Sequence, residues 1–373
     1  MNILLLNWRD PKNPRAGGAE YVSMKHAEAW VSAGHNVTWL SSSFPGGKKE
    51  EVMDGVNIIR RGNGVFLFLH ALYFYKTSTT KYDLVIDEIH GIPFFTPLYV
   101  KEPIVAFIHE VAGEIWNYSY PFPINIVGRL IERLSFSFYR NIQFWTDAQS
   151  TIDELAKMGL RRGLCIAIPC PIDIRPLKTA PSKENYPTFL FIGRLVPMKG
   201  AGDAIDAFFA IRKDFPSARL WIAGLGDDSY LQRLQNKAQK LQLSERVHFY
   251  GYVKQEKKIE LMRRAHLLLH PSVKEGWGLV VLEAASQATP TIGYDVSGLR
   301  DTIVNGVTGV LVEKQSPQAM AKAARLLLKD SKRYATMQHE CLKFSASFSW
   351  MEAVKKSLAM INAVVKKSPV SAI

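Results

Sequence analysis

The feature that most constrains the fold is an alternation of short apolar runs with helix-length segments, which occurs twice along the chain. In the first half, a helix is predicted over 19–33, and runs of strand length lie at 2–8, 35–41, 56–60, 84–87, 104–108 and 144–146. In the second half, helices are predicted over 200–214 and 230–241, and the runs lie at 188–192, 219–223, 247–250, 267–270 and 291–294. Such alternation is typical of α/β layers built on parallel sheets. We therefore predict two α/β domains in tandem.

A proline-bearing segment separates the two halves. Residues 165–187 contain Pro169, Pro171, Pro176, Pro181 and Pro187, which is the composition of a linker. We predict domains at 1–172 and 173–349, followed by a C-terminal segment 350–373 whose first part, 350–367, reads as a helix.

Composition fits a globular protein, with 47% apolar and 22% charged residues. The longest apolar run, 65–75, is interrupted by His70 and is shorter than the roughly 20 residues of a membrane-spanning helix. No secretory signal is expected, because the start has neither a basic leader nor a long apolar region. Cys165, Cys170 and Cys341 form no CxxC pair, which indicates reduced thiols and a cytoplasmic location.

The net charge of +13 is unevenly distributed. Residues 1–173 hold 17 basic and 17 acidic residues, whereas 174–373 hold 30 and 17. A basic second half suits an anionic ligand such as a nucleotide diphosphate, a nucleic acid or an acidic lipid. Charge that only maintains solubility fits equally well.

Two cations follow the strand predicted at 188–192. Arg194 and Lys199 lie in the string GRLVPMKG, after a strand and before a helix. Ligands of open α/β sheets bind at the carboxyl ends of the strands, and there Arg and Lys can neutralise a pyrophosphate. Two solvent-exposed loop cations are the alternative.

Two acids lie eight positions apart in the string PSVKEGWGLVVLEAA. Gly276 and Gly278 permit close approach of the backbone to a ligand, and a helix that starts near Gly278 would direct free N–H groups at a phosphate. Glu275 could reach sugar hydroxyls, and Glu283 could reach a ribose. From spacing alone, a surface acid and a helix acid remain the simpler interpretation.

Two weaker signals lie in the first half. Gly17 and Gly18 stand between the first strand and the first helix, where the backbone could close over an anion. They do not form GxGxxG, so a dinucleotide site gains little support. His109 follows the strand at 104–108, a position at which a histidine is either a structural residue or part of a site.

Taken together, these motifs resemble the retaining glycosyltransferases of family 4, which have the GT-B architecture. The resemblance extends from GGAE at 17–20 to FSW at 348–350, nearly the whole chain. Its most specific part is the E-x7-E pair, Glu275 and Glu283. The strings GRLVPMKG, NGVTG at 305–309 and IPCPID at 168–173 add support.

The resemblance implies two Rossmann-like domains that face each other across a cleft, with an acceptor-side first domain, a second domain that binds the nucleotide sugar, and a C-terminal helix that crosses back to the first domain. The implied activity is transfer of a sugar from a nucleotide-diphosphate donor to a glycan or lipid-linked acceptor, with retention of anomeric configuration, in polysaccharide or glycolipid biosynthesis. Neither the donor sugar nor the acceptor can be named from the sequence.

The resemblance also implies roles for single residues. His109, Arg194, Lys199 and Glu275 would form the catalytic set, in which His109 and Glu275 contact the donor sugar and the two cations hold the diphosphate. Further donor contacts would come from Glu283 at the ribose and from Gly17, Gly18, Gly251, Tyr252, Val253, Gly276, Trp277, Gly278, Leu279 and Val280.

Two departures from the family pattern stand out. Cys170-Pro171 replaces the usual Asn-Gly, which leaves any role of that loop open, and Ala288 replaces a turn glycine. Asp227 and Asp228 are adjacent rather than a DxD, and they suit a helix start better than a metal site. We therefore predict a metal-independent enzyme that needs no cofactor besides its donor substrate.

Two other functions fit parts of the sequence. A sugar-nucleotide 2-epimerase shares the architecture but would form no acceptor product. A nucleic-acid binder would show a basic stripe interleaved with aromatic residues, whereas the cations here are scattered from Lys254 to Lys367. We expect no nucleic-acid partner.

The aromatic-rich segment 116–145 bears on the membrane. If it is one helix, Arg129, Arg133, Phe136 and Arg140 lie within about 60° of arc, and Ile131, Leu134 and Phe138 lie opposite. One face could meet acidic headgroups at the inner side of a membrane, and a solvated basic face is the ordinary alternative. Peripheral contact with an anionic membrane therefore stays open.

Overall fold

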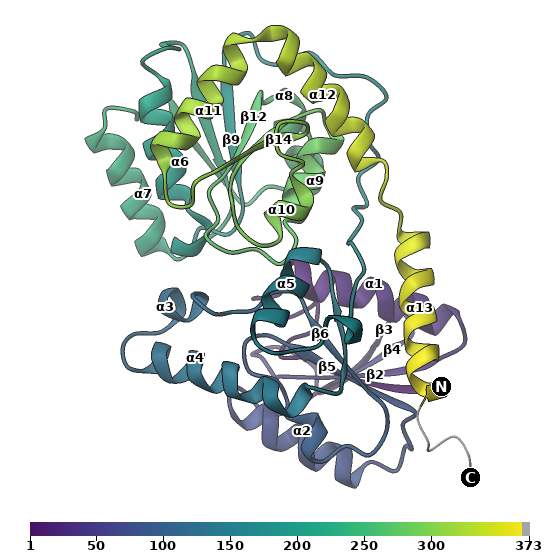
Figure 1. Cartoon of the computed structure of the whole chain (residues 1–373). Helices are drawn as coiled ribbons and strands as arrows, with labels where there is room; N and C mark the ends of the chain where they lie inside the picture. Colours follow the sequence, from purple (N-terminus) through teal and green to yellow (C-terminus); the bar gives the residue numbers. More distant parts are fainter. Residues whose placement is uncertain (368–373) are drawn as a thin grey trace. The chain divides into compact units, whose positions relative to one another are not determined.

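A computed structural model describes residues 1–367, and the chain forms two α/β units (Figure 1). Unit 1 comprises residues 1–170 together with the C-terminal segment from Trp350, and unit 2 comprises residues 171–349. The sequence placed this boundary between 172 and 173. The last six residues of the predicted segment 350–373 lie outside the described residues.

Unit 1 is built on one sheet. Its described residues form eight strands in the order β3-β4-β2-β1-β5-β6-β7-β8. All neighbours are parallel except β3 and β4, which are antiparallel. The strands are β1 (Asn2–Leu6), β2 (Asn36–Ser41), β3 (Glu50–Met53), β4 (Val56–Arg60), β5 (Leu84–Ile89), β6 (Ile104–Ile108), β7 (Gln143–Thr146) and β8 (Cys165–Ala167).

Helices surround this sheet (Figure 1). Those of unit 1 are α1 (Gly18–Ser32), α2 (Phe66–Thr77), α3 (Ile115–Ser119), α4 (Ile124–Ser135), α5 (Gln149–Lys157) and α13 (Trp350–Lys367), with 3₁₀ turns η1 (Thr96–Leu98), η2 (Phe136–Tyr139) and η3 (Arg162–Leu164). Helix α13 is tied to α1 through Ser357, whose hydroxyl accepts the Trp30 Nε1–H at 3.1 Å and lies 2.9 Å from His26 Nδ1.

Unit 2 is a second parallel sheet. In the described chain its six strands run in the order β11-β10-β9-β12-β13-β14. They are β9 (Thr188–Ile192), β10 (Arg219–Ala223), β11 (Val247–Gly251), β12 (Leu267–His270), β13 (Thr291–Tyr294) and β14 (Gly309–Val312). The helices are α6 (Ala201–Ile211), α7 (Asp228–Lys240), α8 (Gln255–Arg264), α9 (Leu279–Ser286), α10 (Leu299–Thr302), α11 (Pro317–Lys329) and α12 (Ser331–Ser345), with one 3₁₀ turn, η4 (Pro197–Lys199).

Both sheets reverse their strand order at one point. β5, β6 and β9 are buried along their whole length, as expected for sheets covered on both faces. In unit 2 the chain adds β10 and β11 on one side of β9 and β12 on the other; in unit 1, β2 and β5 flank β1 in the same way. Loops that leave two such strands diverge and open a crevice at the carboxyl edge, where ligands of open α/β sheets bind.

The structure corrects three local predictions. Residues 165–167 form β8, so the predicted linker at 165–187 begins with a strand. The segment 116–145 is not one helix but α3, α4, η2 and β7. Phe136, which the single-helix reading grouped with the arginines, is 1% exposed and belongs to the core. The pattern also did not reveal the strands β3 and β14 or the helices α2, α5, α8, α11 and α12.

Candidate functional site

The switch point of unit 2 brings two of the predicted site residues into contact. Lys199 ends the turn that follows β9, and Glu275 lies in the loop that follows β12. Lys199 Nζ lies 2.5 Å from Glu275 Oε1, and His270 Nε2, at the end of β12, lies 3.0 Å from the same oxygen. These two strands are neighbours in the sheet although 76 residues separate Lys199 from Glu275. The three side chains form what we call the Glu275 cluster.

The charge of Glu275 is set by this cluster. The carboxylate is buried, and burial alone would raise its pKa. The Lys199 ammonium and the His270 imidazole more than offset that effect and hold the pKa of Glu275 well below its ordinary value. Glu275 is therefore an anion at neutral pH and cannot act as a proton donor there.

Backbone contacts fix the two loops to each other. The Val273 N–H donates to the Met198 carbonyl at 3.0 Å, and the Ser272 hydroxyl lies within hydrogen-bond reach of the same carbonyl at 3.4 Å. Gly200 has a φ of +75°, and a Cβ there would overlap the carbonyl oxygen of Pro271. Only glycine therefore allows the backbone after Lys199 to approach the loop that carries Glu275.

Arg194 lies on the same edge but takes no part in the cluster. Its side chain is exposed, and its guanidinium forms no hydrogen bond or ion pair within residues 1–367. Its backbone is held by the next loop, because the Leu195 N–H donates to the Leu225 carbonyl at 2.6 Å. Arg194 is thus a positioned but uncompensated cation.

A pair of glycines that the sequence reading did not single out makes this packing possible. Side chains at Gly224 or Gly226, in the loop after β10, would overlap the carbonyl oxygens of Gly193 and Leu195. The sequence did contain a signal for these glycines, because Gly224-Leu225-Gly226 follows directly after the strand predicted at 219–223.

Glu283 has a different environment from Glu275. It lies on α9, and its Oε1 is 2.6 Å from Lys258 Nζ on α8. Burial raises its pKa, and Lys258 offsets this only in part. Neither Lys258 nor His270 was identified from the sequence, although His270 carries the strand-end signal that was used for His109.

The predicted backbone donors occupy the same edge. Gly278 is the N-cap of α9, and its carbonyl accepts the Val281 N–H at 2.8 Å, so the amides of Leu279 and Val280 are the ones that open this helix without an acceptor in it. Gly251 ends β11, and its carbonyl accepts the Gly224 N–H at 2.8 Å. The loop after Gly251 exposes 70% of Tyr252. The remaining residues predicted to contact the donor lie close by. Val253 follows Tyr252 in the loop after β11, Gly276 and Trp277 precede Gly278, and Leu279 and Val280 open α9.

In unit 1 the predicted glycines open α1. Gly17 is the N-cap and Gly18 the first helical residue; both are exposed, and the Gly17 N–H donates to Glu20 Oε2 at 2.7 Å. An internal carboxylate already satisfies one amide at this end. An anion that binds at this helix end, as the sequence predicts, must therefore contact the other backbone amides or displace the Glu20 carboxylate.

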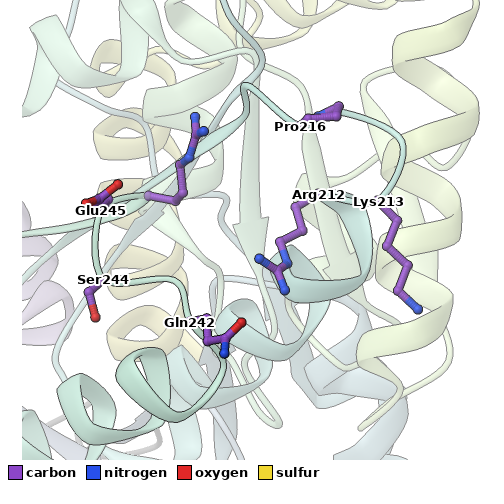
Figure 2. Close-up of a pocket in the computed structure, with 7 residues that line it drawn as sticks. Arg212, Lys213, Pro216, Gln242, Ser244 and Glu245 are labelled. Carbon is purple, nitrogen blue, oxygen red and sulfur yellow. The ribbon is translucent and has the colours of Figure 1, made fainter.

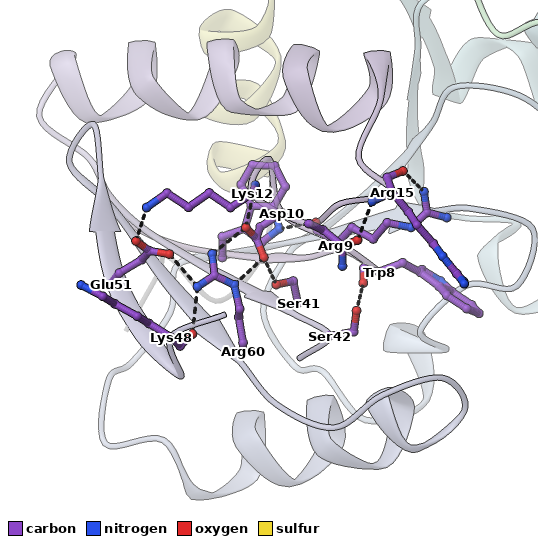
Figure 3. A network of polar contacts seen from close by, with 12 residues as sticks. Trp8, Arg9, Asp10, Lys12, Arg15, Ser41, Ser42, Lys48, Glu51 and Arg60 are labelled. Atoms are coloured by element: carbon purple, nitrogen blue, oxygen red, sulfur yellow. Dashed lines mark hydrogen bonds and ion pairs between the residues drawn. The ribbon is translucent and has the colours of Figure 1, made fainter. Parts of the chain in front are cut away.

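A buried ion pair holds the loop that precedes these glycines (Figure 3). The Arg60 guanidinium binds both oxygens of Asp10, with Nη2–Oδ1 at 2.6 Å and Nε–Oδ2 at 2.7 Å. Arg60 Nη1 also reaches Glu51 at 2.6 Å, and Lys12 pairs with the same acid. Asp10 is fully buried and Arg60 is 1% exposed. The loop at the unit 1 switch point is thus anchored from β4.

His109 is held between two acids. Its Nδ1 lies 2.5 Å from Asp147 Oδ2, and its Nε2 lies 3.2 Å from Glu88 Oε1. Burial would lower its pKa, but the two carboxylates raise the pKa of His109 well above its ordinary value. Both ring nitrogens are therefore engaged within unit 1, and the imidazolium can meet a sugar through a nitrogen only if one of these bonds opens.

Cys170 gives the unusual IPCPID loop a structural explanation. Its buried thiol donates to Asp147 Oδ1 at 3.0 Å, so it supports the acid that holds His109. This contact accounts for a polar residue at position 170, where the family pattern has Asn.

A hollow lined with basic side chains lies elsewhere on unit 2 (Figure 2). It includes Arg212, just after α6, and Arg246, just before β11. Both mark the amino-terminal edge of the sheet, opposite the edge that carries the Glu275 cluster. The hollow is therefore not the predicted site.

Two features are absent from the described residues, 1–367. No helix in this range is both long enough and apolar enough to cross a membrane. No group of three or more His, Cys, Asp and Glu side chains there has an arrangement that could hold a metal ion. Metal independence stays a prediction.

Two family models match the chain. "Glycosyl transferases group 1" matches residues 176–342, and "Glycosyltransferase Family 4" matches residues 16–175. Among curated proteins, glycogen synthase of Mycobacterium tuberculosis is 30% identical over 216 residues, which is 57% of this chain and 50% of that protein. A phosphatidyl-myo-inositol mannosyltransferase of Mycobacterium leprae is 30% identical over 204 residues, 52% of this chain and 53% of that protein. The chain thus spans about half the length of these relatives.

Solved structures resemble the whole chain. Sucrose-phosphate synthase from Thermosynechococcus elongatus superposes with a TM-score of 0.82 at 20% identity, over 98% of this chain and all of that one. Anabaena HepE in complex with UDP-glucose gives 0.74 at 18% identity, over 97% of this chain and all of that one. These likenesses confirm the predicted fold class, α/β with two Rossmann-like parallel-sheet domains of the GT-B kind.

Proposed function

We propose that this chain, which belongs to the glycosyltransferases described by the group 1 and family 4 models, moves a sugar from a nucleotide-diphosphate donor to a glycan or lipid-linked acceptor. The Glu275 cluster at the unit 2 switch point is the observation that supports this most directly. It places an obligate anion and a cation in contact at the carboxyl edge of the sheet. A donor needs both, because its sugar becomes positive and its diphosphate more negative as the bond breaks.

The reaction can be followed as charge moves. The bond between the anomeric carbon and the diphosphate oxygen breaks, and its electron pair goes to that oxygen. The ionised Glu275 would stabilise the oxocarbenium-like sugar, while Lys199, Arg194 and the α9 amides would stabilise the leaving group. The acceptor oxygen then bonds to the anomeric carbon, and its proton goes to the departing phosphate oxygen.

Retention of configuration follows from this route. Acceptor and leaving group share one face of the sugar, and the departing oxygen serves as the base. Because Glu275 is held ionised by Lys199 and His270, it is suited to electrostatic stabilisation rather than to proton donation. Metal independence is part of the same proposal, since the cations that face the diphosphate would be side chains.

The relatives suggest which donors and acceptors to test. HepE binds UDP-glucose, which makes uridine donors the first to test. The mannosyltransferase from Mycobacterium leprae is named for a lipid acceptor, which supports a lipid-linked substrate here. A lipid acceptor would bring a cytoplasmic protein to the inner face of a membrane, as a peripheral contact.

The first experiment measures thermal unfolding with UDP, GDP and ADP, each with and without EDTA. A ligand bound only by the folded state raises the Tm, so one nucleoside diphosphate should do so, and EDTA should not abolish the effect. Lys199→Ala should weaken that binding, or slow transfer, by at least about tenfold. Lys237→Ala is the matched control, because Lys237 pairs with Asp206 on helices of the same unit at the same 2.5 Å.

Two results would contradict the proposal. One is a protein that none of the nucleoside diphosphates stabilises and that releases no nucleotide from any sugar donor. The other concerns the site: a folded Lys199→Ala variant with unchanged binding and transfer removes Lys199 from it. Incubation with donor alone tests the 2-epimerase alternative, which the relatives and structures named above do not support.

A further inference from the structure

Helix α4 of unit 1 is amphipathic with its apolar face turned outward. The residues it buries are Gly128, Glu132 and Ser135. The residues it exposes include six large apolar side chains, between 39% and 59% accessible: Ile124, Ile126, Val127, Leu130, Ile131 and Leu134. We call these six the α4 apolar face. A helix that only served the core would have the opposite orientation.

Specific contacts fix this orientation. The Glu132 carboxylate accepts the backbone N–H groups of Ala112 and Gly113 at 2.7 and 2.8 Å and the Trp116 Nε1–H at 3.0 Å. Gly128 lies against the Trp116 ring so closely that a Cβ would overlap it. Rolling the apolar face inward would break all three hydrogen bonds and lose the fit to Trp116.

The apolar surface continues beyond both ends of the helix. Phe122, just before α4, is 77% exposed. Phe138, just after it, is 48% exposed and lies 6.2 Å from the ring of Phe95, close to η1 with its exposed Leu98. Scattered apolar residues are normal on a protein surface, but a continuous set of this size marks an interaction surface.

The charged residues that α4 itself exposes are both cations. On a helical wheel the α4 apolar face spans about 160°; Arg133 lies about 20° beyond the edge formed by Ile126, and Arg129 lies about 60° beyond it. Both are exposed, as is Arg140 after η2, and none of the three forms an ion pair with a described residue. Glu132 is the one carboxylate in the sequence of α4, and it points inward.

We propose that α4 docks on an anionic lipid bilayer, with its apolar face at the acyl boundary and Arg129, Arg133 and Arg140 among the headgroups. An amphipathic helix with basic residues beside a wide apolar face binds such an interface by burial and by attraction to anionic lipid. The helix has 12 residues, about 18 Å, so it lies on the bilayer rather than across it. A second copy of this chain fits less well, because a symmetric contact pairs the same cation-edged face with itself. The inference depends on this surface alone and not on sugar transfer.

The test is co-sedimentation of the full chain with vesicles, without any donor. The wild type should bind phosphatidylcholine vesicles that contain phosphatidylglycerol and should bind phosphatidylcholine alone about tenfold less. Binding should fall as salt rises. The double variant Leu130→Asn, Leu134→Asn should lose about tenfold or more of the binding. Arg129→Gln with Arg133→Gln should lose the preference for anionic vesicles.

Matched controls exist on unit 2. Leu326 on α11 is 56% exposed, so Leu326→Asn removes a similar apolar side chain from another surface. Lys332→Gln with Arg333→Gln removes two exposed cations from α12. Both should bind vesicles like the wild type, and circular dichroism should show every variant folded.

Three outcomes overturn the proposal. The wild type does not bind anionic vesicles at low salt, or the α4 variants bind as it does. The third is that the wild type sediments as a dimer in solution and the leucine variant as a monomer, which assigns the face to a second copy. Because no nucleotide sugar is present, a failure here leaves the proposed transfer untouched.

Discussion

The two acids of the candidate site are close in sequence, Glu275 in the loop before α9 and Glu283 on α9, but their pKa values are shifted in opposite directions. Both are buried, which disfavours their charged forms. Glu275 faces Lys199 and His270 and has a lowered pKa. Glu283 has a raised pKa, and within the described part of the chain Lys258 is the one cation paired with it. Glu275 is therefore insensitive to pH near neutrality, while Glu283 depends on a single cation for its charge.

Lys258→Ala should therefore make donor binding sensitive to pH. Loss of the cation raises the pKa of Glu283 further, so a growing share is protonated as the pH falls and loses the stronger, charge-assisted hydrogen bond that a carboxylate accepts from a ribose hydroxyl. We expect the donor KM of the variant to rise about three- to tenfold between pH 8 and pH 6, with a smaller change in the wild type. Steady-state kinetics at several pH values measure this.

The neighbouring lysine provides the control. Lys257 pairs with Glu260 at 2.9 Å on the surface, so Lys257→Ala should keep the wild-type pH profile. Parallel profiles for Lys258→Ala and the wild type would show that Glu283 does not bind the donor through its charge.

At the scale of residues, the sequence reveals a site residue when its signal lies in one short motif, and it does not reveal partners that lie far away along the chain. Arg194, Lys199, Glu275 and Glu283 could be named because each lies in a short motif next to a strand end. Their partners could not, because His270 and Lys258 meet the acids only through the order of strands and helices in space. The same holds for His109, whose acids Glu88 and Asp147 lie on other segments of unit 1.

At the scale of elements, the contact of α1 with α13 contains a buried histidine. Burial lowers the pKa of His26 to about 4, and its ring lies 5.7 Å from Trp350 and 4.7 Å from Trp145. The unfolded chain binds a proton on this side chain near pH 6.5, whereas the folded one does so only near pH 4. Its contribution to stability is thus fully present above pH 6.5 and is lost as the pH falls to about 4.

The free energy of unfolding should consequently decrease by about 3 kcal/mol from this group over that window. Urea unfolding at pH 7.5, 6 and 5 measures the slope, and His26→Gln should reduce it. His266 in unit 2 has a similarly lowered pKa of about 4, so His266→Gln should likewise reduce the pH dependence of the free energy of unfolding. The raised pKa of His109 changes stability only above pH 6.5, so His109 affects the pH 7.5 point but not the difference between pH 6 and pH 5, which therefore reports the histidines with lowered pKa. Equal slopes for wild type and His26→Gln would show that His26 is not neutral in the fold.

Helix α4 shows the limit of prediction for elements. The predicted wheel holds for Arg129 and Arg133, which lie within α4, but not for Arg140, which follows η2. It could not tell which face of the helix the protein covers. That choice depends on Glu132, whose three donors belong to the segment before α3 and to Trp116. Apolar runs in contrast predicted the inner strands of both sheets, because a parallel strand buried on two faces needs apolar residues throughout. They missed β3, β8 and β14, which are only partly buried.

At the scale of the whole molecule, the path of the chain couples its ends. The chain leaves unit 1 after Cys170, forms unit 2, and returns at Trp350 so that α13 completes unit 1. The two-domain plan could be predicted because the strand–helix alternation restarts after the proline segment. The contact of α13 with α1 could be expected only from the family resemblance, since 331 residues separate His26 from Ser357.

Because α13 completes unit 1 alone, a defect in its buried face should weaken that unit and spare the other. Ile361 is fully buried, and Ile361→Asp places an uncompensated carboxylate against unit 1, at a cost of several kcal/mol. Amide hydrogen exchange should then accelerate in α1 and β6 and stay unchanged in α6 and β9, since each unit has its own sheet and core. Lys356→Ala, on the exposed side of the same helix, should leave all four segments as in the wild type. Equal acceleration in both units would mean that the chain unfolds as one cooperative body, and α13 would then stabilise the whole molecule rather than the unit it contacts.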